Sequence, residues 1–106
     1  MITDEKLQKA LTYLAETDEP CAKAKSFLAG TEKQEKTIIA IEFANGERGV
    51  EEKKQAAHRS PAYELWRRAY QNAVYDFEIM RNKRQTAELI VEVWRTVQAN
   101  QRRGNV

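Results

Sequence analysis

This sequence of 106 residues has few of the residue types that interrupt helices or build covalent and metal-bound cores. It contains two prolines, four glycines, one cysteine and one histidine. A single cysteine cannot form a disulfide within the chain, and Cys21 with His58 offers too few ligands for a closed zinc site. We therefore expect no bound metal and no cofactor.

Long apolar runs are also absent, since the longest, Ile38–Ile41, has four residues. A membrane-spanning helix needs about 20. Asp4 and Glu5 follow Met1 closely, which argues against a secretory signal or an arginine-rich transit peptide. Hydrophobic residues make up 42% and charged residues 32%, which is typical of a soluble helical protein. Together with the single cysteine and the acidic start, this predicts a cytoplasmic location and no membrane partner.

The apolar residues recur at helical spacing and predict a single all-α domain over residues 1–106. The expected helices span about 3–17, 20–44, 50–58 and 61–101, with Thr3 as the first cap. We expect Pro20 and Pro61 to open helices, Ser60 to cap the last one, and Asn45-Gly46 to form a left-handed helix end. The expected buried stripes are Leu7, Ala10, Leu11 and Leu14, then Ala24, Phe27, Leu28, Thr31, Ile38, Ile41 and Ala44.

Residues 37–43 also fit a β-strand that enters an Asn-Gly hairpin. No second β-rich run follows to pair with such a strand, because residues 49–54 have a helical composition. We therefore favour a helix here.

The last expected helix carries the sharpest pattern. Ten positions from 66 to 98 alternate steps of four and three residues, and eight of them are apolar or aromatic. This spacing is the signature of a coiled-coil seam. We expect an elongated antiparallel helical hairpin or coiled coil with one long C-terminal helix and shorter N-terminal helices. The residues expected to form the seam, including contacts between copies of the chain, are Trp66, Tyr70, Phe77, Met80, Val91 and Trp94.

Helix lengths indicate that the second helix, folded back, leaves the apolar segment 90–98 uncovered. The first helix can cover it with Leu7, Leu11 and Leu14, or a second copy of the chain can do so. We favour a homo-oligomer, most simply a dimer, because small helical domains need extra burial.

Arg84 is the charged exception within the seam. A buried guanidinium needs acceptors, and Glu16, Asp18 and Glu19 are the expected partners. Alternatively, Arg84 marks the point where the seam meets solvent, or it fixes the register of the helices.

The charges divide unevenly along the chain. Residues 1–58 hold nine basic and eleven acidic side chains, whereas residues 59–106 hold nine basic and five acidic ones. Seven-residue multiples place several arginines on one face of the last helix, either following a phosphate backbone or facing acidic residues of a neighbouring helix. The expected residues for binding nucleic acid or a partner are Arg67, Arg81, Lys83, Arg95, Arg102 and Arg103.

The run Asn82–Thr96, with Asn100 and Arg102 after it and Ser60-Pro61-Ala62-Tyr63 before it, resembles the C-terminal signature of a family of small helical phage and prophage proteins. Members of that family are encoded among recombination and replication functions. The resemblance implies a location in the host cytoplasm and a neighbourhood of DNA-processing proteins, and it brings no catalytic residues.

We found no phosphate-binding loop, nucleophile motif or metal-binding motif, so we expect no enzyme and no small-molecule substrate. The leading hypothesis is a non-enzymatic phage accessory protein for DNA recombination or replication, which binds nucleic acid or a DNA-processing partner through its arginines. The alternative is a structural or protein-interaction module, such as a virion assembly factor or an inhibitor of a host protein, with no nucleic-acid contact.

Overall fold

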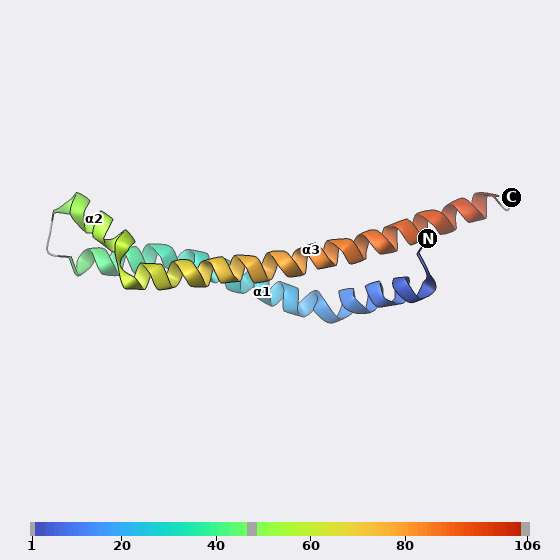
Figure 1. Cartoon of the computed structure of the whole chain (residues 1–106), viewed down its shortest axis with the longest axis horizontal. Helices are drawn as coiled ribbons and strands as arrows, with labels where there is room; N and C mark the ends of the chain where they lie inside the picture. Colours follow the sequence, from blue (N-terminus) through green and yellow to red (C-terminus); the bar gives the residue numbers. More distant parts are fainter. Residues whose placement is uncertain (1, 47–48, 105–106) are drawn as a thin grey trace. The chain divides into compact units, whose positions relative to one another are not determined.

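The computed structural model describes residues 2–46 and 49–104. Within these ranges the chain forms three helices and no strand: α1 (Asp4–Ala44), α2 (Val50–Arg59) and α3 (Pro61–Gly104) (Figure 1). The predicted all-α fold with one long C-terminal helix is therefore confirmed. Residues 37–43 belong to α1, so the helical interpretation of this segment is correct.

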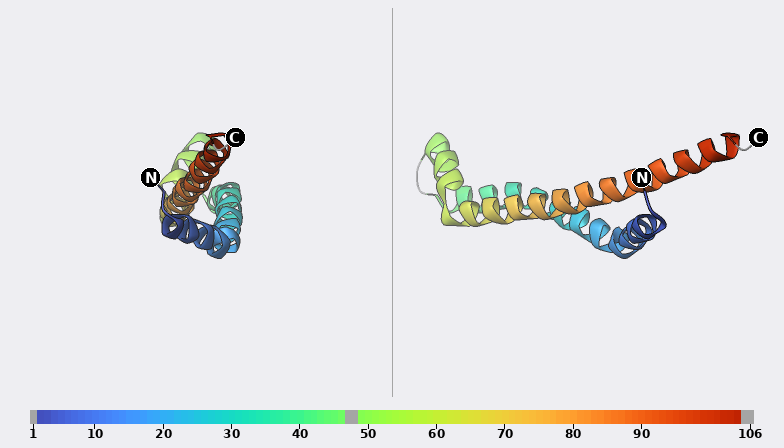
Figure 2. Two further views of the ribbon diagram at one scale, coloured as in Figure 1. Left: turned by 90° about the vertical axis from the view of Figure 1, so that its right-hand side faces the viewer. Right: turned by 45° about the vertical axis from the view of Figure 1, so that its right-hand side comes forward.

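The chain forms two compact units. Unit 1 comprises Met1–Ala22 and Glu78–Val106, and unit 2 is Lys23–Phe77. In each unit a segment of α1 packs against an antiparallel segment of α3. The expectation of a single domain stays a prediction. In unit 2, α2 stands at one end, between the last turn of α1 and the first turn of α3 (Figures 1 and 2).

α1 is one continuous helix, so the predicted break between residues 17 and 20 is wrong. Pro20 lies inside α1 and is exposed, and its missing N–H costs the helix one backbone hydrogen bond. Residues on both sides, including Thr17 and Cys21, are partly buried. Packing along the whole helix outweighs the local cost of about 3 kcal/mol that proline brings. Cys21 is consequently a mid-helix residue and not part of a first turn.

Asn45-Gly46 does not form the predicted left-handed end, because no described residue has a positive φ. Instead the Asn45 amide continues the α-helical pattern by donating to the Ile41 carbonyl, and the Gly46 amide donates to the Phe43 carbonyl three residues earlier, which tightens the last turn of α1. Gly46 allows a close approach here, since a Cβ at this position would lie 3.0 Å from Lys53 Cγ and the lysine side chain would have to shift. This approach brings the Lys53 ammonium to 5.4 Å from the centre of the Phe43 ring.

The predicted caps at Thr3 and Ser60 are confirmed. The Thr3 hydroxyl accepts from the Lys6 amide at 3.1 Å. The Ser60 hydroxyl accepts from the Tyr63 amide at 3.1 Å and donates to the Ala57 carbonyl at 2.8 Å. A single side chain therefore ends α2 and begins α3, with Pro61 at the first helical position.

All ten seam positions predicted in α3 are buried or half-buried. α1 has its own seam, which alternates steps of three and four and contains no exposed residue. In unit 1 it consists of Leu7, Ala10, Leu14, Thr17 and Cys21, and in unit 2 of Ala24, Leu28, Thr31, Glu35, Ile38 and Glu42.

The prediction that Leu11, Phe27 and Ile41 are buried is wrong: these side chains are 41%, 64% and 54% exposed. Ala44 is exposed as well. Leu11, Phe27 and Ile41 each lie beside a seam position of α1, so a short helical stripe drawn through them fits the sequence locally but leaves the longer seven-residue pattern.

The apolar end of α3 is covered from within unit 1. Leu11 and Leu14 border the same hollow as Val91, while Ile2 and Thr3 border another with Trp94. The first of the two predicted ways to cover residues 90–98, by the N-terminal stretch of the chain, is therefore confirmed, while covering by a second copy stays a prediction. The predicted seam residues are used inside the chain, and their role between copies stays a prediction.

Small side chains dominate the core. The buried apolar residues are Ala10, Ala57, Trp66, Ala73 and Ala87. Alanine at a helix contact lets the helix axes approach closely, since the separation depends on the side chains between them. Trp66 is consequently the one large side chain buried in the described core.

Candidate functional site

The centre of unit 2 is a hydrogen bond between its two long helices. The Trp66 indole N–H donates to the Thr31 carbonyl at 2.7 Å, and the two residues are 7% and 5% exposed. The Thr31 hydroxyl donates in turn to the Phe27 carbonyl at 2.9 Å. Because the indole N–H has a partner, the tryptophan is buried without an unsatisfied donor.

A row of rings extends from Trp66 in both directions. His58, Tyr63, Trp66 and Tyr70 follow one another with centroids 5.2 to 5.3 Å apart. The Tyr63 hydroxyl donates to Glu35 Oε2 at 3.2 Å. Burial, and then the Glu35 carboxylate, raise the pKa of Tyr63 above its ordinary 10.0, since both disfavour a phenolate. The row holds the junction of α2 and α3 against α1.

Unit 1 has a different contact between its helices, built on Arg84. Arg84 Nη1 donates to the Thr17 hydroxyl at 2.7 Å and to the Leu14 carbonyl at 2.8 Å. Its Nη2 lies 3.4 Å from Asp18 Oδ1. The predicted partner Asp18 is confirmed, but it is 83% exposed and contributes little. The closer, neutral acceptors were not predicted.

Thr17 and Thr31 occupy matching places in a fourteen-residue repeat of α1. Residues 12–17 read Thr-Tyr-Leu-Ala-Glu-Thr and residues 26–31 read Ser-Phe-Leu-Ala-Gly-Thr. In both copies the last hydroxyl donates to the carbonyl four residues earlier, at 2.6 and 2.9 Å. Fourteen residues are two heptads, so each copy returns to the same side of the helix. Comparing the sequence with itself at this spacing would have found the repeat.

α3 contains a second repeat of the same length. Residues 63–67, 77–81 and 91–95 read Tyr-Glu-Leu-Trp-Arg, Phe-Glu-Ile-Met-Arg and Val-Glu-Val-Trp-Arg. The fourth residue of each copy, and the first residue of the last two copies, are seam positions. The second and fifth residues are a glutamate and an arginine three apart. The third residue is an exposed apolar side chain: Leu65 (69%), Ile79 (39%) and Val93 (43%).

The arginines of the first two copies bind glutamates on their own helix. Arg67 Nη2 and Nε lie 2.7 and 3.0 Å from the Glu64 carboxylate, and Arg81 Nη1 lies 3.2 Å from both Glu78 oxygens. Hydrogen bonding to Arg67 lowers the pKa of Glu64 to about 2. These two arginines are therefore partly neutralised before any partner arrives.

The other predicted binding residues lie in unit 1. Arg95 borders a hollow of about 390 Å³ that also contains the acidic side chains Glu88 and Glu92. Lys83, Arg102 and Arg103 are exposed, the last two in the final turn of α3. Unit 1 therefore contains a cation beside carboxylates, Arg95, and a separate basic pair in the last turn of α3, Arg102 and Arg103.

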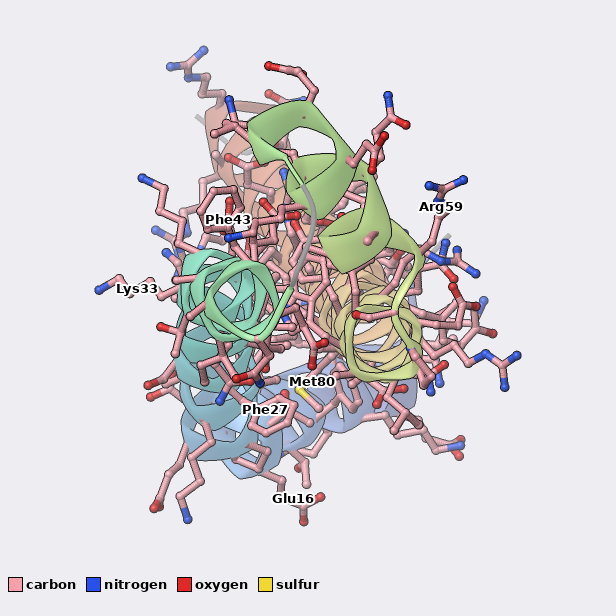
Figure 3. All side chains as sticks on the ribbon, turned by 90° about the vertical axis from the view of Figure 1, so that its left-hand side faces the viewer. Glu16, Phe27, Lys33, Phe43, Arg59 and Met80 are labelled. Carbon is pink, nitrogen blue, oxygen red and sulfur yellow. The ribbon has the colours of Figure 1, made fainter. Side chains whose placement is uncertain are left out.

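Large apolar side chains are exposed on the outside of unit 2. In α3, Leu65 and Tyr75 are 69% and 66% exposed, and Phe27 of α1 is 64% exposed. Figure 3 shows the charged side chains of Lys33 and Arg59 projecting away from the helices of this unit. In unit 1 the corresponding group on α3 is Ile79, Leu89 and Val93.

A hollow of about 440 Å³ lies on α2, bordered by Lys54, Gln55, His58 and Arg59. His58 Nδ1 lies 2.7 Å from the Lys54 carbonyl, so this nitrogen carries the proton and donates along its own helix. In residues 2–46 and 49–104, no three His, Cys, Asp or Glu side chains are grouped as metal ligands. The same ranges contain no helix with the length and hydropathy to cross a membrane.

Comparisons with protein family models, with curated proteins and with solved structures found no match to this chain.

Proposed function

We propose that this chain is a non-enzymatic helical interaction protein, and that unit 2 binds an amphipathic helix of a partner protein. The observation that carries this proposal is the exposure of Leu65 and Tyr75 on α3, at 69% and 66%. They lie ten residues, or about 15 Å, apart along one helix, which matches the spacing of apolar anchors on a partner helix.

The charges on α3 support a protein partner over nucleic acid. Glu64 accepts from Arg67 and from Arg68, whose Nε lies at 3.3 Å, directly beside Leu65. An apolar side chain framed by paired charges suits the centre and rim of a protein interface. A phosphate backbone would instead compete with Glu64 for both arginines.

The test is capture of partners from nuclease-treated lysate of the source cells, using the full chain as bait. We expect one protein to be retained by the wild type and lost with Leu65→Glu. Gln71→Glu, an equal charge change at another exposed position of α3 in unit 2, serves as the matched control and retains the protein. Equal capture by both variants contradicts the proposal.

An accessory role in DNA recombination or replication is the second candidate. It is supported by the exposed pair Arg102 and Arg103 and by the exposed Lys83. DNA affinity should then fall steeply with salt, and replacing the pair with alanine should reduce the slope of log K against log salt by about 2. Arg67→Ala with Arg81→Ala should change this slope less, since both side chains are bound to glutamates. Absence of DNA binding at low salt excludes this candidate.

A further inference from the structure

Unit 1 leaves three large apolar side chains of α3 exposed. Ile79, Leu89 and Val93 are 39%, 59% and 43% exposed. Exposed apolar side chains that lie together on one face of a helix are typical of a protein–protein contact.

Unit 1 presents an outer stripe on the side of α3 that faces away from α1. Positions 79, 82, 86, 89 and 93 alternate steps of three and four, and all five side chains are exposed. They are Ile79, Asn82, Thr86, Leu89 and Val93. This spacing equals that of the buried seam, so a second helix can pack along it in the same way.

We propose that this outer stripe is the interface with a second copy of the chain, with the two α3 segments parallel and in register. Each apolar residue of the stripe then contacts the same residue of the other copy. The Asn82 side chain can both donate and accept, so it can form a hydrogen bond with its own counterpart. The Thr86 hydroxyl already donates to the Asn82 carbonyl of its own helix at 3.1 Å and can still accept. A contact between identical patches is the usual basis of a twofold dimer.

The charges beside the stripe favour the parallel orientation. In a parallel pair, Glu78 of one copy approaches Lys83 of the other, five residues further along. Glu78 already accepts from Arg81, and a carboxylate has acceptor sites for a second cation. The antiparallel pairing that matches Ile79 with Leu89 instead sets Lys83 against Lys83 and Glu78 near Glu92, which is unfavourable.

This dimer concerns side chains of unit 1, whereas the proposed function concerns Leu65 and Tyr75 of unit 2, at earlier positions of the same three-and-four pattern on α3. It also differs from the seam first expected between copies, whose residues pack inside the chain. Loss of the dimer and loss of the partner protein are therefore caused by different substitutions.

The first test is sedimentation equilibrium of the full chain at about 100 μM. We expect twice the mass of 12.3 kDa for the wild type, and an increase of about 30-fold or more in the dissociation constant for Leu89→Glu. Ala15→Glu, the same charge at an exposed position of α1 in unit 1, is the control and stays dimeric. A wild type at single-chain mass, or equal masses for both variants, overturns the proposal.

The second test reports orientation and does not depend on how the glutamate variant folds. In a Cys21→Ser background, Leu89→Cys chains should form a disulfide-linked dimer under mild oxidation, whereas Ala15→Cys chains should not. An antiparallel pair instead links Leu89→Cys chains to Ile79→Cys chains, and that product overturns the parallel arrangement. Equal oxidation of Leu89→Cys and Ala15→Cys chains overturns the interface.

Discussion

Unit 2 joins its helices through Trp66 and unit 1 through Arg84, although Thr31 and Thr17 come from copies of one repeat. On the α1 side the arrangement is the same, because each hydroxyl donates to a carbonyl four residues earlier. On the α3 side an indole with one donor replaces a guanidinium that reaches three acceptors. The comparison shows that the repeated surface of α1 can pack against either an indole or a guanidinium of α3, because its threonine hydroxyls already donate within α1.

The largest expected effect comes from removing the tryptophan. Trp66→Ala should lower the free energy of unfolding of unit 2 by about 3–5 kcal/mol, because it leaves a cavity at the centre of the core. Trp66→Phe, which mainly removes the bond to Thr31, should cost about 1 kcal/mol. Amide hydrogen exchange measures both effects, with the greater loss of protection in unit 2. Equal loss of amide protection in the two units would contradict the prediction that Trp66 stabilises mainly unit 2.

Removing the arginine should cost less. We expect Arg84→Ala to destabilise unit 1 by about 2 kcal/mol, and Arg84→Met by about 1 kcal/mol or less. The methionine restores apolar packing, while the Thr17 hydroxyl keeps its bond to the Tyr13 carbonyl. Urea denaturation of the two variants gives the comparison. A cost for Arg84→Met as large as that for Trp66→Ala would show that the charge itself holds unit 1 together.

High pH should affect unit 2 through Tyr63. Its raised pKa means that the folded state favours the neutral phenol, so the corresponding stability is complete below the ordinary value of 10.0. This stability is lost as the pH rises above that value and through the folded pKa. Urea midpoints at pH 8 and pH 11, followed by Trp66 fluorescence in a Trp94→Phe background, should show the loss. Tyr63→Phe should remove this part of the pH dependence, and an unchanged dependence would contradict the assignment.

The smallest effect concerns the ion pair on the surface of unit 2. Because its folded pKa is depressed, Glu64 contributes stability that is present above its ordinary value of 4.5 and lost as the pH falls through about 2. Carboxyl chemical shifts measured during an acid titration should give a pKa of about 2. The value should rise towards 4.5 in Arg67→Gln and stay unchanged in Arg81→Gln, the matching variant in unit 1. Titration of wild-type Glu64 near 4.5 would refute the pairing.

Structural features that depend on a seven-residue pattern along a whole helix, or on a hydrogen bond between nearby residues, could be predicted from the sequence. The seven-residue pattern of α3 identified ten positions that are all sheltered from solvent, and Ser60-Pro61 identified the start of that helix. Asp18 was one of three carboxylates expected near Arg84, and it lies 3.4 Å from Arg84 Nη2. These predictions depended on geometry that a single helix, or one antiparallel pair, imposes on its residues.

Predictions that relied on short windows were wrong for a physical reason. Phe27 and Leu28 are adjacent, and only the seven-residue pattern of the whole helix shows that Leu28 faces α3. Pro20 is a local stop signal, but packing on both sides of it continues the helix. Asn45-Gly46 fits two kinds of helix end, and the structure has the one closed by the bond from the Gly46 amide to the Phe43 carbonyl.

The sequence predicted only in part which arginines are available to bind a partner. The alignment of the arginines along α3 follows from the sequence. Whether an arginine can bind a partner depends on whether its side chain already forms an ion pair within the chain. Arg67 and Arg81 turn back to glutamates three residues earlier, a spacing that is visible in the sequence yet compatible with other pairings.

The fourteen-residue repeat also bears on how the chain folds. If one helix slipped along the other by two heptads, Arg84 would meet Leu28, Thr31 and Glu32, which reproduce the types of group it contacts at Leu14, Thr17 and Asp18. The slipped pairing would therefore differ little in free energy from the native one along the seam, so it would be a candidate kinetic trap during refolding. Correct alignment then depends on the connection that contains α2 and Ser60, because its length limits how far one long helix can shift along the other.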